Sequence, residues 1–182
     1  GTHLTTGHIS QLAYIDDQVI ANIDGTAVAF AVAGNALERL GNVSVTGRVL
    51  DILAQADGFI ILSDQQLVSL TPDRLVRKRH MGSFVAMSRH ADKIYVVTVT
   101  GDLLVVDNSF NVLAHKLGLN SSALLPLQGY LLSLSESDQT AHIIDVHNPN
   151  LVFVAGQYPM VLNNQANAAI VSGGRLWIGG AD

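Results

Sequence analysis

The clearest indication of the fold in this sequence is the stretch Ile23-Asp24-Gly25-Thr26-Ala27-Val28-Ala29-Phe30. Its Asp-Gly pair favours a tight turn, and the apolar run after the pair, which ends in an aromatic residue, is typical of a strand. A similar layout returns about every 40 residues, which indicates a repeated unit. The later copies lie at residues 64–70, 100–107 and 138–145, and a last Asp182 follows them. The stretch is therefore one copy of a recurring unit.

Each copy of the turn lies within a unit of four short runs. Two runs precede the turn, one follows it directly, and a more polar run, such as residues 74–80, completes the unit. Short runs rich in Val, Ile and Leu between turn residues indicate strands, and no capped periodic stretch is long enough for a helix. Four strands in about 40 residues are typical of a β-propeller blade. We therefore predict an all-β chain built of four-stranded antiparallel blades.

The predicted blades occupy residues 8–41, 47–80, 83–118 and 121–157, and residues 166–182 supply two strands of a fifth. Residues 1–7 are interpreted as an N-terminal tail or the remnant of a tag. An open blade exposes unpaired strand edges and an apolar face. We therefore expect about four and a half blades of a larger propeller, whose remaining strands come from further chain or from another subunit.

The composition narrows the function classes. Hydrophobic residues make up 48% of the chain and charged residues 14%, which is typical of a folded domain. A net charge of −5 and an aromatic content of 5% argue against nucleic acid as a partner. The chain has no cysteine, which favours a cytoplasmic location. Polar residues and Pro126 interrupt the longest uncharged stretch, so we expect no membrane span.

The sequence carries no motif for catalysis. None of the seven histidines has the spacing beside a glutamate that a helical zinc site needs, and neither a nucleophile elbow nor a phosphate-binding loop is present. We expect a protein that is not an enzyme and holds no metal and no cofactor. Asp24, Asp64 and Asp138 recur at one place in the repeat, where an aspartate caps its own turn, so we interpret them as structural residues.

Several residues hold fixed positions in the repeat. Gly7 and His8 precede the first run, an aspartate marks the turn, and a large apolar residue ends the third run, where Val106-Asp107 and Ile144-Asp145 form apolar-Asp pairs. This layout resembles the WD-repeat family, in which Gly-His, a turn Asp and a Trp-Asp pair hold these places. The repeat positions are His8, Asp24, Phe30, Asp64, Leu70, Val106, Asp107, Asp138, Ile144, Asp145 and Asp182.

The resemblance to WD repeats implies a propeller that binds other proteins. It implies that His8 and Asp24 belong to a buried hydrogen-bonded set and that Phe30 replaces the family's Trp in the core. The chain departs from the pattern, because it has no Trp-Asp pair and only the first unit keeps both the His and the Asp. Within the family, residues 7–30 and 163–182 resemble the second propeller of the actin-interacting protein 1 family. That resemblance implies actin and cofilin as partners.

Basic residues are concentrated in one part of the chain, since residues 74–93 hold six of the ten Lys and Arg. In a propeller, the outer strand of the second blade and the first hairpin of the third adjoin, so these residues predict one basic rim patch. Such a patch suits an acidic partner surface, although charged outer strands also resist edge-to-edge aggregation. The patch comprises Arg74, Arg77, Lys78, Arg79, Arg89 and Lys93.

Three functions follow from these observations. The first is a non-catalytic protein-protein interaction scaffold. The second is a propeller enzyme or ligand-binding domain with a site in the central channel, for which the innermost strands offer Gln11, Asp51 and Ser88 as isolated polar residues. The third is a structural half-propeller that completes another subunit.

Overall fold

The computed structural model describes residues 7–127, 129–160, 166–172 and 175–180. The chain divides into two compact units, which we call unit 1 (residues 1–84) and unit 2 (residues 85–182). The regular structure of the described residues consists of β-strands. These residues include no helix with the length and apolar character needed to cross a membrane.

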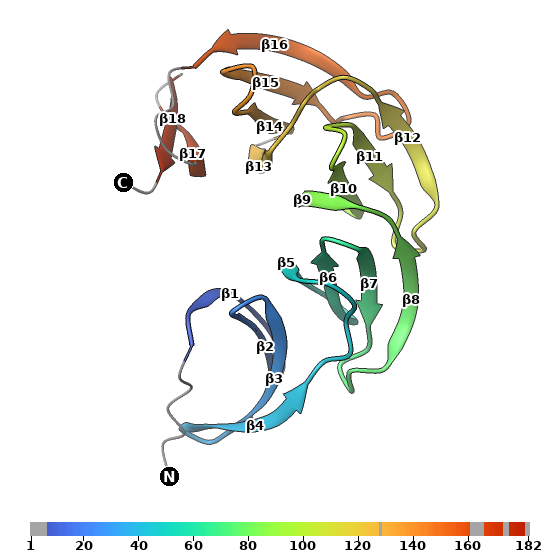
Figure 1. Ribbon diagram of the computed structural model, residues 1–182, viewed down its shortest axis with the longest axis vertical. Coiled ribbons are helices and arrows are strands. Elements are labelled where there is room, and N and C mark those ends of the chain that lie inside the picture. Colours follow the sequence, from blue (N-terminus) through green and yellow to red (C-terminus); the bar gives the residue numbers. More distant parts are fainter. Residues whose placement is uncertain (1–6, 128, 161–165, 173–174, 181–182) are drawn as a thin grey trace. The chain divides into compact units, whose positions relative to one another are not determined.

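Unit 1 contains two four-stranded antiparallel sheets, in which each strand pairs with the next along the chain (Figure 1). The first sheet comprises β1 (Ile9–Ile15), β2 (Gln18–Ile23), β3 (Thr26–Ala33) and β4 (Ala36–Asn42). The second comprises β5 (Val49–Gln55), β6 (Gly58–Ser63), β7 (Gln66–Leu70) and β8 (Val76–Met81).

Two further four-stranded sheets follow, and β17 and β18 form a two-stranded sheet. The third sheet begins at the last residue of unit 1 and continues through β9 (Phe84–His90), β10 (Lys93–Thr98), β11 (Leu103–Val106) and β12 (Val112–Lys116). The fourth sheet comprises β13 (Ala123–Leu127), β14 (Tyr130–Ser135), β15 (Thr140–Asp145) and β16 (Phe153–Pro159). The last two strands are β17 (Ala166–Ser172) and β18 (Arg175–Gly180). The predicted four-stranded antiparallel repeat is confirmed.

The hairpin of the opening stretch forms as its sequence predicts. Ile23 pairs with Thr26 across a two-residue loop. Both loop residues have positive φ, 50° at Asp24 and 81° at Gly25. Asp-Gly suits such a loop because Gly adopts positive φ without a steric penalty and Asp tolerates it better than most residues.

The core of unit 1 lies between its two sheets. Strand β6 is buried along its whole length, which explains its continuous apolar sequence. Its Phe59 and Ile61 pack in one cluster with Ile20 of β2 and Val68 of β7. The outer strands β4 and β8 are mostly exposed, and they carry the charged side chains of these two sheets' strands except Asp51 on β5.

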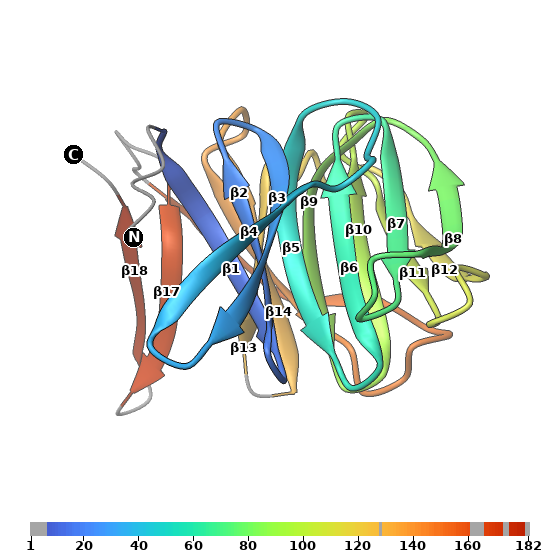
Figure 2. The same cartoon turned by 90° about the horizontal axis from the view of Figure 1, so that it is seen from below.

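Unit 2 repeats this arrangement. Tyr95 of β10 and Leu103 of β11 pack in one cluster with Leu131 of β14 and Ile144 of β15. Figure 2 shows β5, β6 and β7 of unit 1 side by side along their length. Because the middle strands are largely buried, most of the exposed polar side chains lie on outer strands, turns and linkers.

Candidate functional site

The predicted basic residues occupy different kinds of position. Arg77, Lys78 and Arg79 lie on β8 and are exposed. Arg89 lies on β9 and Lys93 on β10, and both are half-buried. The three residues on β8 belong to unit 1, whereas Arg89 and Lys93 belong to unit 2. The joining of both groups into one patch therefore stays a prediction.

Arg74 does not lie on the outer strand, contrary to the sequence prediction, because β8 begins at Val76. It lies in the turn after β7, with a φ of 66°, and its amide donates a hydrogen bond to the carbonyl of Thr71. Its guanidinium Nη1 lies 3.5 Å from the carbonyl oxygen of Leu40 on β4. Arg74 thus bridges the two sheets of unit 1 and is turned away from the exposed row on β8.

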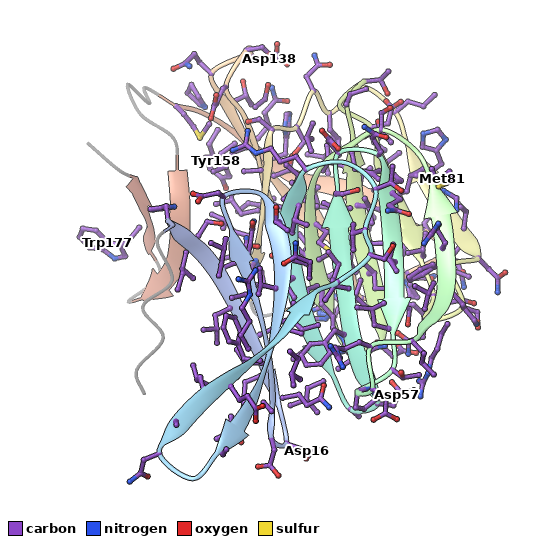
Figure 3. All side chains as sticks on the ribbon, turned by 60° about the horizontal axis from the view of Figure 1, so that its bottom comes forward. Asp16, Asp57, Met81, Asp138, Tyr158 and Trp177 are labelled. Atoms are coloured by element: carbon purple, nitrogen blue, oxygen red, sulfur yellow. The ribbon has the colours of Figure 1, made fainter. Side chains whose placement is uncertain are left out.

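Arg77 has an acidic partner. It forms an ion pair with Asp57, which lies in the turn between β5 and β6 (Figure 3). Both side chains are largely exposed, at 40% and 65%. An exposed pair of this kind contributes about 0–1 kcal/mol to stability. Its main effect here is to offset the charge of Arg77.

Lys78 and Arg79 have no hydrogen-bond or ion-pair partner among the side chains that the structure describes. Their register places them on opposite faces of the sheet. Lys78 pairs with Ser69 and Arg79 with Val68, and Val68 faces the core between the two sheets. A β-bulge between Ser69 and Leu70 leaves Arg77 as the extra residue of β8. The positive charge therefore projects to both sides of this edge strand.

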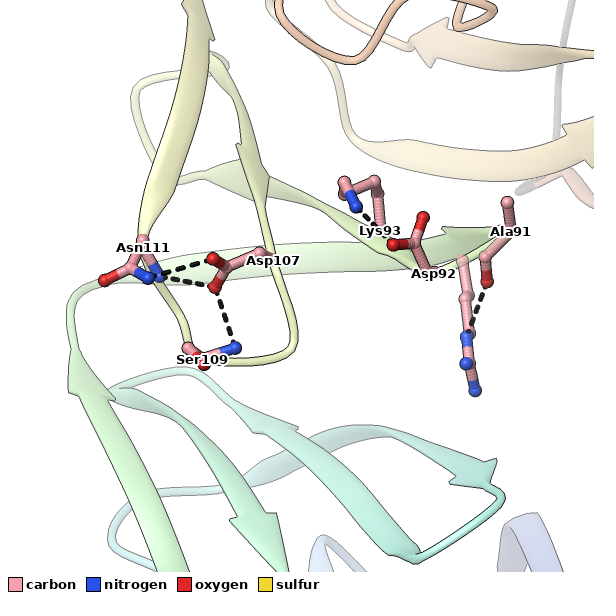
Figure 4. A network of polar contacts seen from close by, with 7 residues as sticks. Ala91, Asp92, Lys93, Asp107, Ser109 and Asn111 are labelled. Atoms are coloured by element: carbon pink, nitrogen blue, oxygen red, sulfur yellow. Dashed lines mark hydrogen bonds and ion pairs between the residues drawn. The ribbon is translucent and has the colours of Figure 1, made fainter.

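The two basic residues of unit 2 are tied to their own hairpin. Lys93 forms an ion pair with Asp92 (Figure 4). The Arg89 Nε donates a hydrogen bond of 3.0 Å to the carbonyl of Ala91. The Lys93 side chain is 19% exposed. These contacts leave β8 as the more accessible part of the predicted patch.

The other complete outer strands differ from β8 in charge. Strand β4 has the sequence ALERLGN, with one residue of each sign, and β16 has FVAGQYP, with none. Strand β12 ends in His115 and Lys116. The run of three cations is thus particular to β8 and is no general property of an outer strand in this fold.

The turn aspartates make a different contact from the one predicted. The sequence predicts that each aspartate caps its own turn, but Asp24 accepts a hydrogen bond from the backbone N–H of His8 at 3.1 Å. Asp64 accepts one from the N–H of Arg48 at 2.9 Å. Both donors lie directly before the first strand of the same sheet. The carboxylates therefore hold the incoming linker against the sheet, a contact that we call the linker latch.

The latch recurs in unit 2 in varied form. Asp138 accepts a hydrogen bond from the side chain of Asn120, which precedes β13, at 2.9 Å. Asp102 instead accepts one from the N–H of Gly118, in the linker after β12, at 3.0 Å. These donors hold the pKa of both carboxyl groups below the ordinary value.

The turns are capped by residues near the end of the second strand, which sequence reasoning missed. Asn22 accepts the N–H of Gly25 at 3.0 Å, and the Ser63 hydroxyl accepts the N–H of Gln66 at 3.0 Å. Thr98 and Ser135 accept the N–H of Asp102 and Asp138, both at 3.2 Å. The sequence signal is a small polar residue at the end of an apolar run, one to four residues before the aspartate.

The WD-like positions are used only in part. His8 is exposed, and it meets Asp24 through its backbone N–H, so the buried His-Asp set that the resemblance implies is replaced by a main-chain contact. Leu70, Val106 and Ile144 are buried at or next to the ends of third strands, whereas Phe30 is buried within β3, which continues to Ala33. Asp182 lies outside the described residues.

The aspartates at or directly after the ends of third strands organise the following loops. Asp107 accepts hydrogen bonds from the N–H groups of Ser109 and Asn111 (Figure 4), and Asp145 accepts one from the N–H of His147. These are the turn-capping contacts that sequence reasoning assigned to Asp24 and Asp64. An aspartate does cap a turn in the repeat, but it is the aspartate at the end of the third strand and not the one between the second and third strands.

The structure brings together two residues that the sequence presents as isolated. Asp51 on β5 and Gln11 on β1 form a side-chain hydrogen bond, and the Gln11 Oε1 is buried without a partner among the described atoms. Burial raises the pKa of Asp51 to about 6, against the lowering effect of hydrogen bonds from the Ile52 N–H and Gln11. Ser88 is buried on β9, in unit 2.

Comparisons with known proteins establish the fold. Neither the protein-family models nor the curated proteins include a match to this chain. Among solved structures, the Neurospora crassa Pan2 WD40 domain is similar at 20% identity and a TM-score of 0.65, over 84% of this chain and 50% of that one. BamB from Moraxella catarrhalis is similar at 16% identity and a TM-score of 0.70, over 93% of this chain and 54% of that one. A chain of the mitotic checkpoint complex is similar at 11% identity and a TM-score of 0.75, over 97% of this chain and 60% of that one.

These likenesses concern the fold. The chain is built as a β-propeller, with four-stranded antiparallel blades like those of a WD40 domain, which confirms the predicted fold class. It spans between half and two thirds of the length of each of these solved chains.

Proposed function

We propose that this chain is a non-catalytic protein-interaction scaffold and that β8 binds an acidic surface of a partner protein. The observation that carries the proposal is the pair Lys78 and Arg79. Both are exposed, they are consecutive on an outer strand, and they have no ion-pair partner among the described side chains. Cations placed in this way are available to an incoming carboxylate.

The charge distribution supports this assignment. The whole chain carries a net charge of −5, so its field attracts no acidic partner in general. A local row of cations then directs an acidic partner to one strand, because charges farther than about 10 Å are screened at ordinary salt. Complementary charge of this kind mainly raises the association rate and fixes the orientation of the partner.

A titration with an acidic probe tests the proposal. The probe is a short acetylated peptide with three successive glutamates flanked by valines, labelled for fluorescence anisotropy. We expect the double variant Lys78→Glu, Arg79→Glu to bind it at least about tenfold more weakly. The matched control is Arg39→Glu, Lys116→Glu, which makes the same change of net charge on β4 and β12. Equal weakening by both variants, or no binding by the unmodified chain, would overturn the proposal.

Actin and cofilin are the first named partners to test, since the resemblance to the actin-interacting propeller names them. The proposal includes a cytoplasmic location, for which the cysteine-free composition is the argument. Co-sedimentation with cofilin-decorated actin filaments, at micromolar concentrations of the chain, tests this finer form. If the chain is absent from the pellet, actin and cofilin are excluded as its partners. The general scaffold proposal is then tested by the peptide titration alone.

A ligand-binding site on the inner strands is the second candidate function. Its supporting observation is the contact between Gln11 and Asp51, which places a carboxyl group with a raised pKa beside a buried, unpartnered amide oxygen. This candidate predicts that a ligand changes the environment of Gln11 and Asp51 and leaves β8 unchanged. The third prediction, a half-propeller that completes another subunit, is tested by light scattering, where a stable monomer would count against it.

A further inference from the structure

We infer that the partner of β8 is an extended acidic segment that adds to the second sheet as a fifth strand, beside β8. This inference rests on the proposed function and specifies the shape of the partner. It follows from the position of β8 in its sheet, from the alternation of its cations, and from the residues at its two ends.

Strand β8 is the last strand of its sheet, and among the described strands it pairs only with β7. One side of its backbone therefore presents N–H and C=O groups that a further strand can pair with. An extended peptide that adds to such an edge gains main-chain hydrogen bonds, and its alternate side chains meet the two faces of the sheet.

The alternation of charge on β8 favours an added strand over a folded partner. Lys78 lies on the face of Ser69 and Arg79 on the face of Val68, so the two cations point to opposite sides. A flat partner surface laid on one face meets one of these charges. The successive side chains of an added strand also alternate between the faces, so consecutive acidic residues reach Lys78 and Arg79 together.

The ends of β8 define the rest of the partner. Val76 is 43% exposed and Met81 is 60% exposed. Figure 3 shows Met81 at the opposite end of this sheet from Asp57. Strand β8 therefore has a cationic centre between two exposed apolar residues. A complementary segment has two or three consecutive acidic residues with an apolar residue on each side.

A second copy of this chain does not fit the same edge. Two β8 strands side by side would bring their cations into proximity, and like charges on neighbouring strands are destabilising. Charges of one sign on an edge strand are a known means of preventing this pairing. An acidic strand is attracted by Lys78 and Arg79, whereas an uncharged strand gains no electrostatic attraction from these two residues.

The test compares the glutamate peptide with a version of the same sequence whose backbone amides are N-methylated. Both versions have the same charge and side chains, but the methylated one lacks the N–H groups that pair with a strand edge. We expect the methylated peptide to bind the unmodified chain at least about tenfold more weakly. Equal affinities would overturn the added strand while leaving charge-directed binding in place.

The variants separate the inference from the proposed function. If the double variant Lys78→Glu, Arg79→Glu binds the glutamate peptide more weakly, and N-methylation of the peptide also weakens its binding to the unmodified chain, the proposed function and the added strand are both supported. If the double variant has no effect, the proposed function fails whatever the methylated peptide does. A peptide of the same length with lysines in place of the glutamates is the remaining control, and binding as tight as that of the glutamate peptide would overturn the acidic partner.

Discussion

The carboxylate of Asp64 accepts a hydrogen bond of 2.9 Å from the backbone N–H of Arg48, which lies directly before the first strand of the same sheet. The contact ties the start of the sheet to the turn between its second and third strands. Asp24 and His8 form the same contact in the first sheet. This latch explains why an aspartate recurs in the repeat.

Removal of the latch is expected to destabilise unit 1. Asp64→Ala leaves the N–H of Arg48 without its acceptor, at a cost of about 1 kcal/mol, because the bond is near solvent and water partly replaces it. Urea unfolding followed by circular dichroism measures the change. Asp73→Ala, at an exposed aspartate in the turn before β8, is the control. An equal loss in both variants would show that the latch adds nothing.

The latch also requires a glycine at position 47. Gly47 has a φ of +82°, and a Cβ there would lie 2.1 Å from the Asp64 Oδ1. We therefore expect Gly47→Ala to destabilise the chain by about 1–3 kcal/mol, from backbone strain and the displaced carboxylate. Gly34→Ala is the matched control, because Gly34 also has positive φ, +60°, but nothing within 4 Å of its Cβ position. Equal losses in thermal unfolding would mean that strain alone acts and that crowding by Asp64 is absent.

The sequence predicts the architecture because apolar runs between turn residues leave few alternatives. Gly47 and Arg48 repeat the Gly7-His8 layout before Asp64, so the latch in the second sheet was open to prediction. Two other features of the structure could not be predicted from the sequence. The partner of Arg77 is Asp57, in a turn two strands earlier, and the partner of Asp51 is Gln11, in another sheet. Such pairs depend on how sheets pack, which periodicity does not reveal.

The half-buried carboxyl of Asp51 predicts a pH dependence of stability. Its pKa rises from 3.8 to about 6, because burial disfavours the charged form and β1 and β6, the strands beside it, carry no charged residue. The protonated form therefore stabilises the fold at low pH. That stabilisation is full below pH 4 and is lost as the pH rises through 6, by up to about 3 kcal/mol.

Asp51→Asn is expected to abolish this dependence. Relative to the unmodified chain, the variant should gain unfolding free energy between pH 5 and pH 8, when both are measured by urea unfolding. Asp73→Asn, at an exposed position, should show no such gain. A difference between Asp51→Asn and the unmodified chain that stays constant over this range would contradict the raised pKa.

We propose that β8 is the surface that binds a partner. The most direct measurement is the change in backbone amide shifts, by nuclear magnetic resonance, as the glutamate peptide is titrated into the labelled chain. We expect the largest changes along Val76–Met81, with weaker ones in the neighbouring turn at residues 71–75. Changes that gather at Gln11 and Asp51 while the amides of β8 stay unchanged would contradict the claim and favour a site on the inner strands.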